Sequence, residues 1–189
     1  LRLSEVNRMK TITFPVGYRP HYLKQFLNSL STQSLEGYTI ICSAENHAGC
    51  IKVLETCGLP IIILHKPEST GKRSHSGARD NMFNVLNYAF NNGSTFNVHL
   101  EDDFILSPDA LDLANWYYET YKDKPMTYMS YGLFNWSSNG DDFVGVTTAP
   151  AFHGLGWGAF RENWENCYGK FWYDDVLARK HANAYGWDW

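Results

Sequence analysis

The feature that most constrains the fold is a regular alternation of two kinds of segment along the first half of the chain. Short runs rich in β-branched and apolar residues are predicted to be strands, at 11–16, 38–44, 59–65 and 96–100. Between them lie segments with apolar residues at helical spacing, at 21–33, 47–58 and 78–93. A strand–helix–strand order places consecutive strands parallel in one sheet, because the helix returns the chain across a face of that sheet. The alternation therefore predicts an α/β sandwich around a mostly parallel sheet.

Local signals support the ends of these elements. Pro20 fits the first turn of the helix that follows it, and Gly58 is expected to end the next helix. The run 59–65 is apolar almost throughout, which is typical of a parallel strand covered on both faces. Ser107 is expected to cap a later helix, with Pro108 at its first position.

The second half of the chain has weaker patterns. Strands are predicted at 126–134 and 143–150, and 157–182 is expected to be mostly helical. We expect residues 1–10 to form an N-terminal extension and residues 11–189 to form one domain.

Charge and composition exclude several kinds of partner. The net charge is −4 and no long basic run occurs, so we expect no nucleic-acid partner. No apolar run is long enough to span a membrane, and the polar N-terminus lacks the apolar core of a signal peptide. The four cysteines show no metal-binding spacing, so we expect reduced thiols in a cytoplasmic protein.

Three consecutive acids, Glu101, Asp102 and Asp103, follow the predicted strand 96–100 directly. In parallel sheets, ligands bind beyond the carboxyl ends of the strands. Burying unpaired carboxylates is costly, and a divalent cation with diphosphate oxygens would supply the opposite charge. Carboxylate and phosphate oxygens suit Mg²⁺ or Mn²⁺. A solvated acidic turn, or acids that favour the start of a following helix, would give the same triplet.

The segment HLEDDFILSPDAL, which contains these acids, resembles the acidic "DxD" element of GT-A-fold glycosyltransferases. In motif it is most similar to the N-acetylglucosaminyltransferase I type. The resemblance implies a GT-A-like fold and transfer of a sugar from a nucleotide-sugar, with a UDP-sugar favoured, to a glycan or other hydroxyl acceptor. It also implies that Asp103 holds Mn²⁺ (or Mg²⁺), while Glu101 and Asp102 contact the sugar-nucleotide. Domains of this fold usually run longer, so we expect the chain to be truncated at its C-terminus.

The resemblance implies further donor-binding residues at the ends of other strands. The end of the first strand and the loop after it would meet the nucleotide, and an acid after the second strand would meet the base. Basic residues around the loop before the acidic triplet would lie near the diphosphate, where cations stabilise a leaving pyrophosphate. The candidates are Pro15, Val16, Arg19, Glu45, Lys72, Arg73 and Arg79. Solvated surface charges are the alternative interpretation of Glu45 and of the Lys72–Arg73 pair.

The glycine-rich segment 149–160 (APAFHGLGWGAF) resembles a loop that lies under the donor sugar and the acceptor in this family. The resemblance makes Trp157 a donor-site candidate and His153 a candidate for an additional metal ligand. A buried aromatic turn, and a histidine that binds no metal, are the alternatives.

An inverting transfer needs one base, which takes the proton of the acceptor hydroxyl as its oxygen attacks the anomeric carbon. Two acidic positions resemble the family's base. Asp188 lies between Trp187 and Trp189, whose rings could raise its pKa and stack on a sugar. The adjacent pair Asp174 and Asp175 resembles an acid-acid-x-x-Leu pattern but also fits the polar face of a helix. We favour Asp188.

Two other functions stay open from the sequence. A sugar nucleotidyltransferase shares a similar layered fold, but it would need a glycine-rich, basic signature after the first strand. The segment PVGYRPHY, residues 15–22, has one glycine and one arginine there. A non-catalytic carbohydrate-binding module would keep an aromatic surface without needing Asp103 or Asp188.

Overall fold

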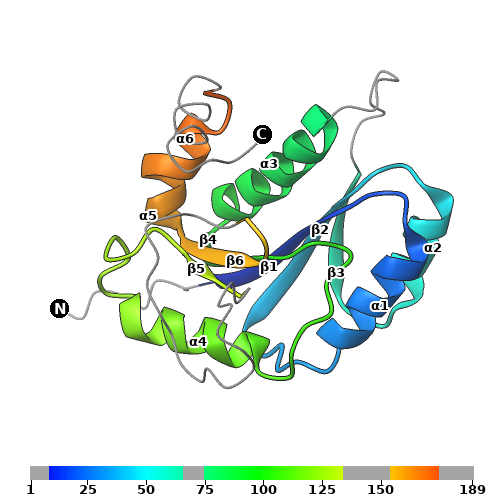
Figure 1. The fold of residues 1–189 in the computed structure, drawn as a ribbon, viewed down its shortest axis with the longest axis horizontal. Coiled ribbons are helices and arrows are strands. Elements are labelled where there is room, and N and C mark those ends of the chain that lie inside the picture. Colours follow the sequence, from blue (N-terminus) through cyan, green and yellow to red (C-terminus); the bar gives the residue numbers. More distant parts are fainter. Residues whose placement is uncertain (1–8, 66–74, 134–153, 175–189) are drawn as a thin grey trace, which may run out of the picture.

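A computed structural model describes residues 9–65, 75–133 and 154–174, and all structural statements below concern these residues. Within them the sheet has six strands in the order β3-β2-β1-β4-β6-β5. The strands are β1 (Met9–Val16), β2 (Tyr38–Ala44), β3 (Ile61–His65), β4 (Ser94–His99), β5 (Tyr131–Gly132) and β6 (Trp157–Phe160). The first four run parallel, β6 is antiparallel to β4, and β5 is antiparallel to β6 (Figure 1).

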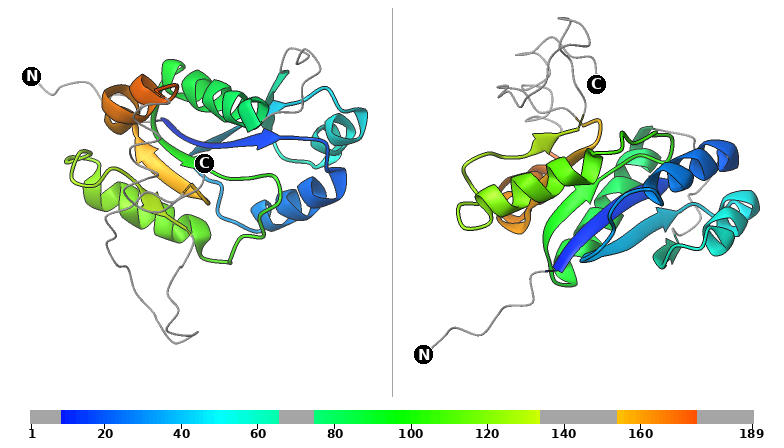
Figure 2. Two further views of the ribbon diagram at one scale, coloured as in Figure 1. Left: turned by 45° about the horizontal axis from the view of Figure 1, so that its top comes forward. Right: turned by 90° about the horizontal axis from the view of Figure 1, so that it is seen from below.

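Helices cover both faces of this sheet. They are α1 (Pro20–Leu30), α2 (Ala48–Thr56), α3 (His75–Asn91), α4 (Ala110–Tyr121), α5 (Arg161–Asn163), the π-helical turn η1 (Trp164–Tyr168) and α6 (Gly169–Phe171). One face carries α1, α2 and α4, and the other carries α3 and the segment from α5 to α6 (Figures 1 and 2). The predicted α/β sandwich with a mostly parallel sheet is therefore confirmed. None of the helices in the described ranges has the length and apolar character that crossing a bilayer requires.

Alternate residues of the central strands enter two separate cores, as a pleated strand requires. Ile12 and Phe14 of β1 point toward α1, where the rings of Phe14 and Phe26 meet edge to face at 4.9 Å. The core on the other face is built around Leu86 of α3 and Trp157 of β6. The four cysteines are unpaired, as predicted.

Several predicted boundaries are confirmed. Pro20 occupies the start of α1, and the positive φ angles of Gly58 (78°) and Gly93 (104°) follow the ends of α2 and α3. The first strand begins at Met9, two residues earlier than predicted.

The prediction that 59–65 is covered on both faces is wrong. In the described part of the sheet β3 is an edge strand that pairs with β2 alone, and 41% of the surface of Ile62 is exposed. An apolar run indicates a strand, but it carries no information on where that strand lies in the sheet. The predicted start of the later helix is also wrong, because Asp109 is the N-cap and the helix begins at Ala110. Ser107 and Pro108 precede it in a turn, where the Ser107 carbonyl accepts hydrogen bonds from the Ala110 N–H and from the Gln33 side chain.

The predicted strand 126–134 is reduced to the two residues of β5, and 143–150 lies outside the described residues. The expectation of helix from residue 157 onward is wrong for the first four residues, which form β6. All four residues of β6 are buried, and the strand lies between β4 and β5 in the sheet. Helix begins only at Arg161, whose guanidinium donates two hydrogen bonds to the Ser94 carbonyl at the start of β4.

A row of fully buried polar side chains joins β1 to β4 on the α3 face. Thr11 is hydrogen-bonded to Ser94 (2.8 Å) and to the Asn97 amide oxygen (2.8 Å). The Asn97 amide nitrogen donates to Thr13 (2.9 Å), and Thr13 lies 3.0 Å from Nδ1 of His99. Burial lowers the pKa of His99 to about 3, so its ring is neutral, and its Nε2 has no hydrogen-bond partner within the described ranges. The row makes the pairing of β1 with β4 specific, because slippage would leave buried polar atoms unsatisfied.

Gly158 of β6 is required by close packing. A Cβ at this position would lie 2.2 Å from the Tyr131 ring and 2.9 Å from the Asn97 carbonyl oxygen. The ring of Tyr131 in turn stacks on Phe96 of β4 at 6.0 Å. At Gly158 the glycine is therefore required by the close approach of a core side chain and of the backbone of β4.

We predict that Gly158→Ala destabilises the protein by about 1–3 kcal/mol, because the added methyl overpacks the core between Tyr131 and Asn97. Urea unfolding measures the free energy of unfolding. Gly132→Ala is the matched control, since a Cβ at Gly132 of the neighbouring strand meets nothing within 4 Å. Equal effects of the two substitutions would contradict this account of the packing.

Candidate functional site

The candidate site lies where β1, β2 and β4 reach their carboxyl ends. Glu101, Asp102 and Asp103 follow β4, and residues 17–19 follow β1 directly beside them. The Leu100 N–H donates to the Thr13 carbonyl at 2.9 Å, so the ladder between the two strands continues up to the acids. The sequence-predicted acids and the predicted nucleotide-binding loop thus lie together.

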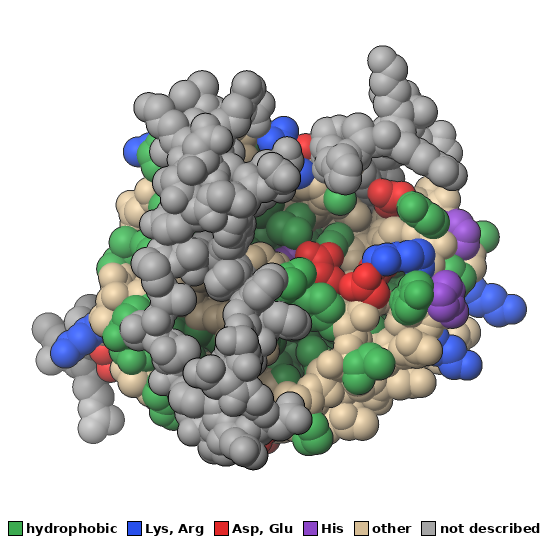
Figure 3. Space-filling model, in the orientation of Figure 1, with side chains coloured by type: hydrophobic (Ala, Val, Ile, Leu, Met, Phe, Trp, Pro, Cys, Tyr) green, Lys and Arg blue, Asp and Glu red, His purple; other side chains and the backbone are tan. Residues whose placement is uncertain are grey.

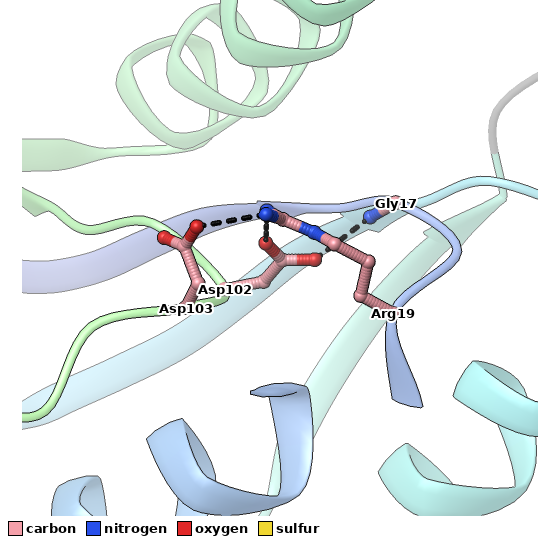
Figure 4. Close-up of polar contacts among 4 residues, drawn as sticks. All are labelled: Gly17, Arg19, Asp102 and Asp103. Atoms are coloured by element: carbon pink, nitrogen blue, oxygen red, sulfur yellow. Dashed lines mark hydrogen bonds and ion pairs between the residues drawn. The ribbon is translucent and has the colours of Figure 1, made fainter. Parts of the chain in front are cut away.

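Asp102 ties these two chain segments to each other. Its side chain is 4% exposed; one carboxylate oxygen accepts the Gly17 N–H at 3.0 Å and the other accepts the Arg19 guanidinium at 2.8 Å (Figure 4). These contacts satisfy the buried carboxylate. As placed, Asp102 fixes the loop after β1 against the end of β4.

Asp103 is more open to solvent. Its side chain is 35% exposed and lies 2.9 Å from a second nitrogen of Arg19, so one guanidinium bridges two carboxylates. Arg19 thus forms a cluster of opposite charges with Asp102 and Asp103. Figure 3 shows acidic and basic side chains next to each other on one face of the molecule. Asp103 is the member of this pair that has accessible surface for a ligand.

Glu101 is partly buried, and its carboxylate has no hydrogen bond among the contacts of the described residues. Burial, followed by the negative charges of Asp102 and Asp103, raises the pKa of Glu101 to about 7, and the positive charge of Arg19 partly offsets this rise. The three acids therefore hold more negative charge than Arg19 balances, and near neutral pH a proton on Glu101 relieves part of the excess.

The described residues do not form a complete metal cage. Within 9–65, 75–133 and 154–174, no three histidine, cysteine, aspartate or glutamate side chains are grouped so that they could hold a metal ion. A cation that takes one or two carboxylates and completes its shell with phosphate oxygens needs no such cage. Exposed Asp103 beside partly buried Glu101 fits that kind of site. His153, the other predicted ligand, lies outside the described residues.

The remaining candidates, at the ends of β1 and β2 and in β6, differ in how far their side chains are buried. Glu45 follows β2, as predicted, and is partly buried; its N–H donates to the Val16 carbonyl at 3.0 Å, so Glu45 lies beside the end of β1. Pro15 is partly buried, whereas the side chain of Val16 is fully buried. Trp157 is 1% exposed and packs against His99 and Tyr168 with ring centroids 5.7 and 5.3 Å apart. The side chains of Val16 and Trp157 thus support the site from within the core.

Arg79 lies in the first turns of α3, as predicted. The guanidinium carbon is 5.2 Å from the ring centroid of Tyr173, and the Tyr173 hydroxyl donates to Asp80 at 3.0 Å. Lys72, Arg73, Asp175 and Asp188 lie outside the described residues.

The segment from α5 to residue 174 runs along one stripe of α3. At one end Phe90 stacks on Trp164 with centroids 5.5 Å apart, and Phe83 meets Trp172 and Tyr173 at 6.0 and 5.0 Å. At the other end Arg79 meets Tyr173. Because α3 runs antiparallel to the strands on either side of it, its first turns lie at the carboxyl edge of the sheet (Figure 1). The chain therefore returns to the edge that carries the acids.

Sequence reasoning missed these supporting contacts. Neither the Gly17 N–H, which binds Asp102, nor Tyr173, which meets Arg79, was predicted as part of the site. The stripe of α3 has a sequence signal, since Arg79, Phe83 and Phe90 are four and seven residues apart. That spacing shows a shared helix face but does not identify the segment that packs on it.

Comparison with known proteins gives a likeness of fold. No protein-family model matches the chain, and no curated protein matches it. Among solved structures, it is similar to the mannosyltransferase PcManGT of Pyrobaculum calidifontis in complex with GDP-Man and Mn²⁺, with 14% identity, 84% of this chain covered and a TM-score of 0.58. It is also similar to the apo-form glycosyltransferase GlyE of Streptococcus pneumoniae TIGR4, with 13% identity, 92% of this chain covered and a TM-score of 0.51.

The chain spans 46% of the length of the mannosyltransferase and 39% of the length of GlyE. At these identities the likeness shows the fold, which is that of nucleotide-diphospho-sugar transferases, and the predicted GT-A-like sandwich is confirmed. The likeness to the N-acetylglucosaminyltransferase I type stays a prediction.

We predict that Glu101→Gln stabilises the protein at pH 8 and not at pH 4. Below the ordinary pKa of 4.5 the carboxyl is protonated in both the folded and the unfolded chain, so it has no differential effect. As pH rises toward 7, the unfolded chain loses the proton first and wild type loses stability, on the order of 2–3 kcal/mol.

Urea unfolding of both proteins in EDTA at the two pH values gives the difference directly. The exposed Glu55→Gln is the control for the removal of one acidic side chain. A Glu101→Gln advantage that is the same at pH 4 and pH 8 would rule out the raised pKa as its cause.

Proposed function

We propose that the protein is a metal-dependent, inverting glycosyltransferase that moves a sugar from a nucleotide-sugar, with a UDP-sugar favoured, to a glycan or other hydroxyl acceptor. The observation that carries this proposal is the acidic triplet at the carboxyl end of central strand β4, in contact with the loop after β1, in a sheet of the nucleotide-diphospho-sugar transferase fold. Ligands of parallel sheets bind at this edge.

The donor side of the proposal rests on the charge pattern. Asp103, with Glu101 beside it, would hold Mn²⁺ or Mg²⁺, and His153 is a further candidate ligand. A bound divalent ion stabilises the negative charge that develops on a leaving diphosphate. In the structure a nitrogen of the Arg19 guanidinium lies 2.9 Å from the Asp103 carboxylate and balances its charge. With a nucleotide-sugar and the ion bound, the ion would balance the charge of Asp103 instead. Arg19 could then donate to diphosphate oxygens while it keeps Asp102.

Other residues complete the proposed donor pocket. Glu45, held at the end of β1 by its hydrogen bond to Val16, would contact the base. Arg79, with Lys72 and Arg73 preceding it in the sequence, would contact the diphosphate. The complex of the similar mannosyltransferase contains GDP-Man and Mn²⁺, which makes GDP a necessary second candidate beside UDP.

The transfer itself needs one carboxylate of this chain. As the acceptor oxygen bonds to the anomeric carbon, the bond to the diphosphate breaks and the diphosphate leaves with the electron pair. The hydroxyl proton passes to the base. The sequence alone favours Asp188, but we now propose Asp175 as the base, because Tyr173 contacts Arg79 and Asp80 in the first turns of α3 and Asp175 lies two residues after Tyr173 in the sequence.

We predict that one of UDP, GDP and dTDP binds with micromolar affinity in the presence of Mn²⁺, and that EDTA or Asp103→Ala weakens this binding at least about tenfold. The reason is that Asp103 is the exposed carboxylate of the cluster. Calorimetric titration measures the affinity of each nucleotide. Asp112→Ala, which removes an exposed acid of α4, is the matched control. Failure of all three nucleotides to bind would overturn the transferase proposal and leave a sugar-binding module.

We predict that Asp175→Asn lowers the rate of sugar transfer or donor hydrolysis by about 10²–10⁴-fold and leaves nucleotide affinity within about twofold, as loss of a general base would. Asp188→Asn is expected to have a much smaller effect on the rate. The rates are measured at saturating donor, with the donor chosen from the titration. Asp174→Asn is measured beside them, and a larger effect of this substitution would assign the base to Asp174. The reverse order of the two effects would assign the base to Asp188.

A further inference from the structure

The Arg19 guanidinium is the positive charge of the acid cluster. One of its terminal nitrogens lies 2.8 Å from the Asp102 carboxylate and the other lies 2.9 Å from the Asp103 carboxylate (Figure 4). The same charge acts on Glu101, where it offsets part of the rise in pKa that burial and the two aspartates cause. Among the ion pairs of the described residues, Arg19 is the only cation that contacts these acids.

The two ion pairs of Arg19 differ in how firmly they are held. The Asp102 side chain is almost fully buried and also accepts the Gly17 N–H at 3.0 Å, so this pair is shielded from water. The side chains of Asp103 and Arg19 are 35% and 41% exposed, and water and salt weaken exposed ion pairs. The guanidinium carbon also lies 5.5 Å from the centroid of the Tyr22 ring, a contact that does not depend on Asp103. The pair with Asp103 can therefore open while the other contacts of Arg19 persist.

The pair that can open is the one that involves the proposed metal ligand. Asp103 is the carboxylate proposed to hold Mn²⁺ or Mg²⁺, and in the structure this carboxylate is paired with Arg19. Two cations that share one carboxylate repel each other, because their separation is well inside the screening length of about 8 Å at physiological ionic strength. Arg19 thus opposes the binding of a free divalent ion. A diphosphate brings negative charge that both cations can contact, and this charge removes the opposition.

We propose that Arg19 is an internal counter-cation that weakens binding of the free divalent ion at Asp103 and makes tight metal binding depend on the nucleotide. This inference rests on the proposed function and concerns the regulation of the same site. Without a nucleotide, Arg19 balances the charge of Asp103. When a diphosphate binds, the guanidinium turns from Asp103 to the phosphate oxygens and keeps Asp102. By thermodynamic reciprocity, metal and nucleotide strengthen each other's binding by the same factor.

Titration with Mn²⁺ alone tests the competition, with Arg19→Gln as the main variant. Glutamine removes the charge but keeps an amide that can donate to Asp102. The substitution is expected to tighten the binding of Mn²⁺ alone at least about tenfold, as measured by calorimetry and by electron paramagnetic resonance of the free ion. Asp103→Ala in the same background is expected to abolish this gain. Lys24→Gln, which removes an exposed positive charge of α1, is the matched control and is expected to change the affinity less than about twofold.

Arg19→Lys separates the effect of the charge from the effect of the side-chain shape. Lysine keeps the positive charge but lacks the planar fork with which arginine contacts both aspartates, and Mn²⁺ alone is expected to bind within about threefold of wild type. Equal gains in the lysine and glutamine variants would show that a loosened loop, and not the lost charge, makes Asp103 available, and would overturn the inference. Urea unfolding of each variant checks that the fold is retained.

Wild type supplies a second measurement that does not depend on any variant. Its affinity for Mn²⁺ is expected to rise at least about tenfold in the presence of the nucleotide that it binds, and in Arg19→Gln this factor is expected to be smaller. If the nucleotide leaves the Mn²⁺ affinity of wild type unchanged, or if Arg19→Gln binds Mn²⁺ alone no more tightly than wild type, the inference is overturned while the proposed function stands. If wild type binds no nucleotide, the proposed function fails and the inference fails with it.

Discussion

The hydrogen bonds of the Asp102 carboxylate are the interaction on which the geometry of the site depends. β1 and β4 are neighbours in the sheet but are separated in sequence by two further strands and three helices. Their backbone ladder extends only to Leu100, and beyond it Asp102 alone bonds to both the Gly17 N–H and Arg19 among the contacts of the described residues. Without this carboxylate, the polar contacts of the described residues that join the two loops would be reduced to the solvent-exposed pair of Arg19 and Asp103. Asp102 therefore determines where the remaining charges of the site lie.

The electrostatics of the site follow from this arrangement. One guanidinium cannot neutralise three carboxylates. Glu101 is partly buried and its carboxylate has no hydrogen bond among the contacts of the described residues, so Glu101 is the group whose charge is disfavoured. Added positive charge would reverse that preference and make the ionised form of Glu101 the stable one. The cluster is thus more stable with a cation or a proton than without one, and a carboxyl group whose pKa is raised in this way marks a candidate functional site.

Much of the fold could be predicted from the sequence, because the signals are local. Periodicity predicts the parallel strands and their helices, and Pro20 and Gly58 indicate helix ends through the backbone conformations that they favour. The place of a strand in the sheet is a property of the whole chain, and for this reason the exposure of Ile62 was not predictable. The four residues of β6 contain two aromatics, a glycine and an alanine, too short a pattern to distinguish a strand from the start of the helix that follows.

The same distinction applies to the candidate site. The acids after β4 were predictable, since a polar triplet at the end of an apolar strand is a local feature. The three acids differ in their roles: Asp102 is buried and joins the two loops, Glu101 is partly protonated, and Asp103 is exposed. These differences depend on which loop lies opposite the acids, and no local pattern in the sequence contains that information. The burial of Trp157 was not predictable either, because an aromatic residue beside glycines fits both a ligand-contacting loop and a core strand.

The row of buried polar groups between β1 and β4 has one more physical consequence. Each threonine hydroxyl can both donate and accept, and the Asn97 amide can turn over, so every hydrogen bond from Thr11 to His99 can reverse its direction together with the others. In one direction Nε2 of His99 carries the ring proton, and in the other it carries a lone pair. The interior of the sheet thus forms a chain of dipoles with two polarities, and reversing it moves hydrogens and one amide group but shifts no strand.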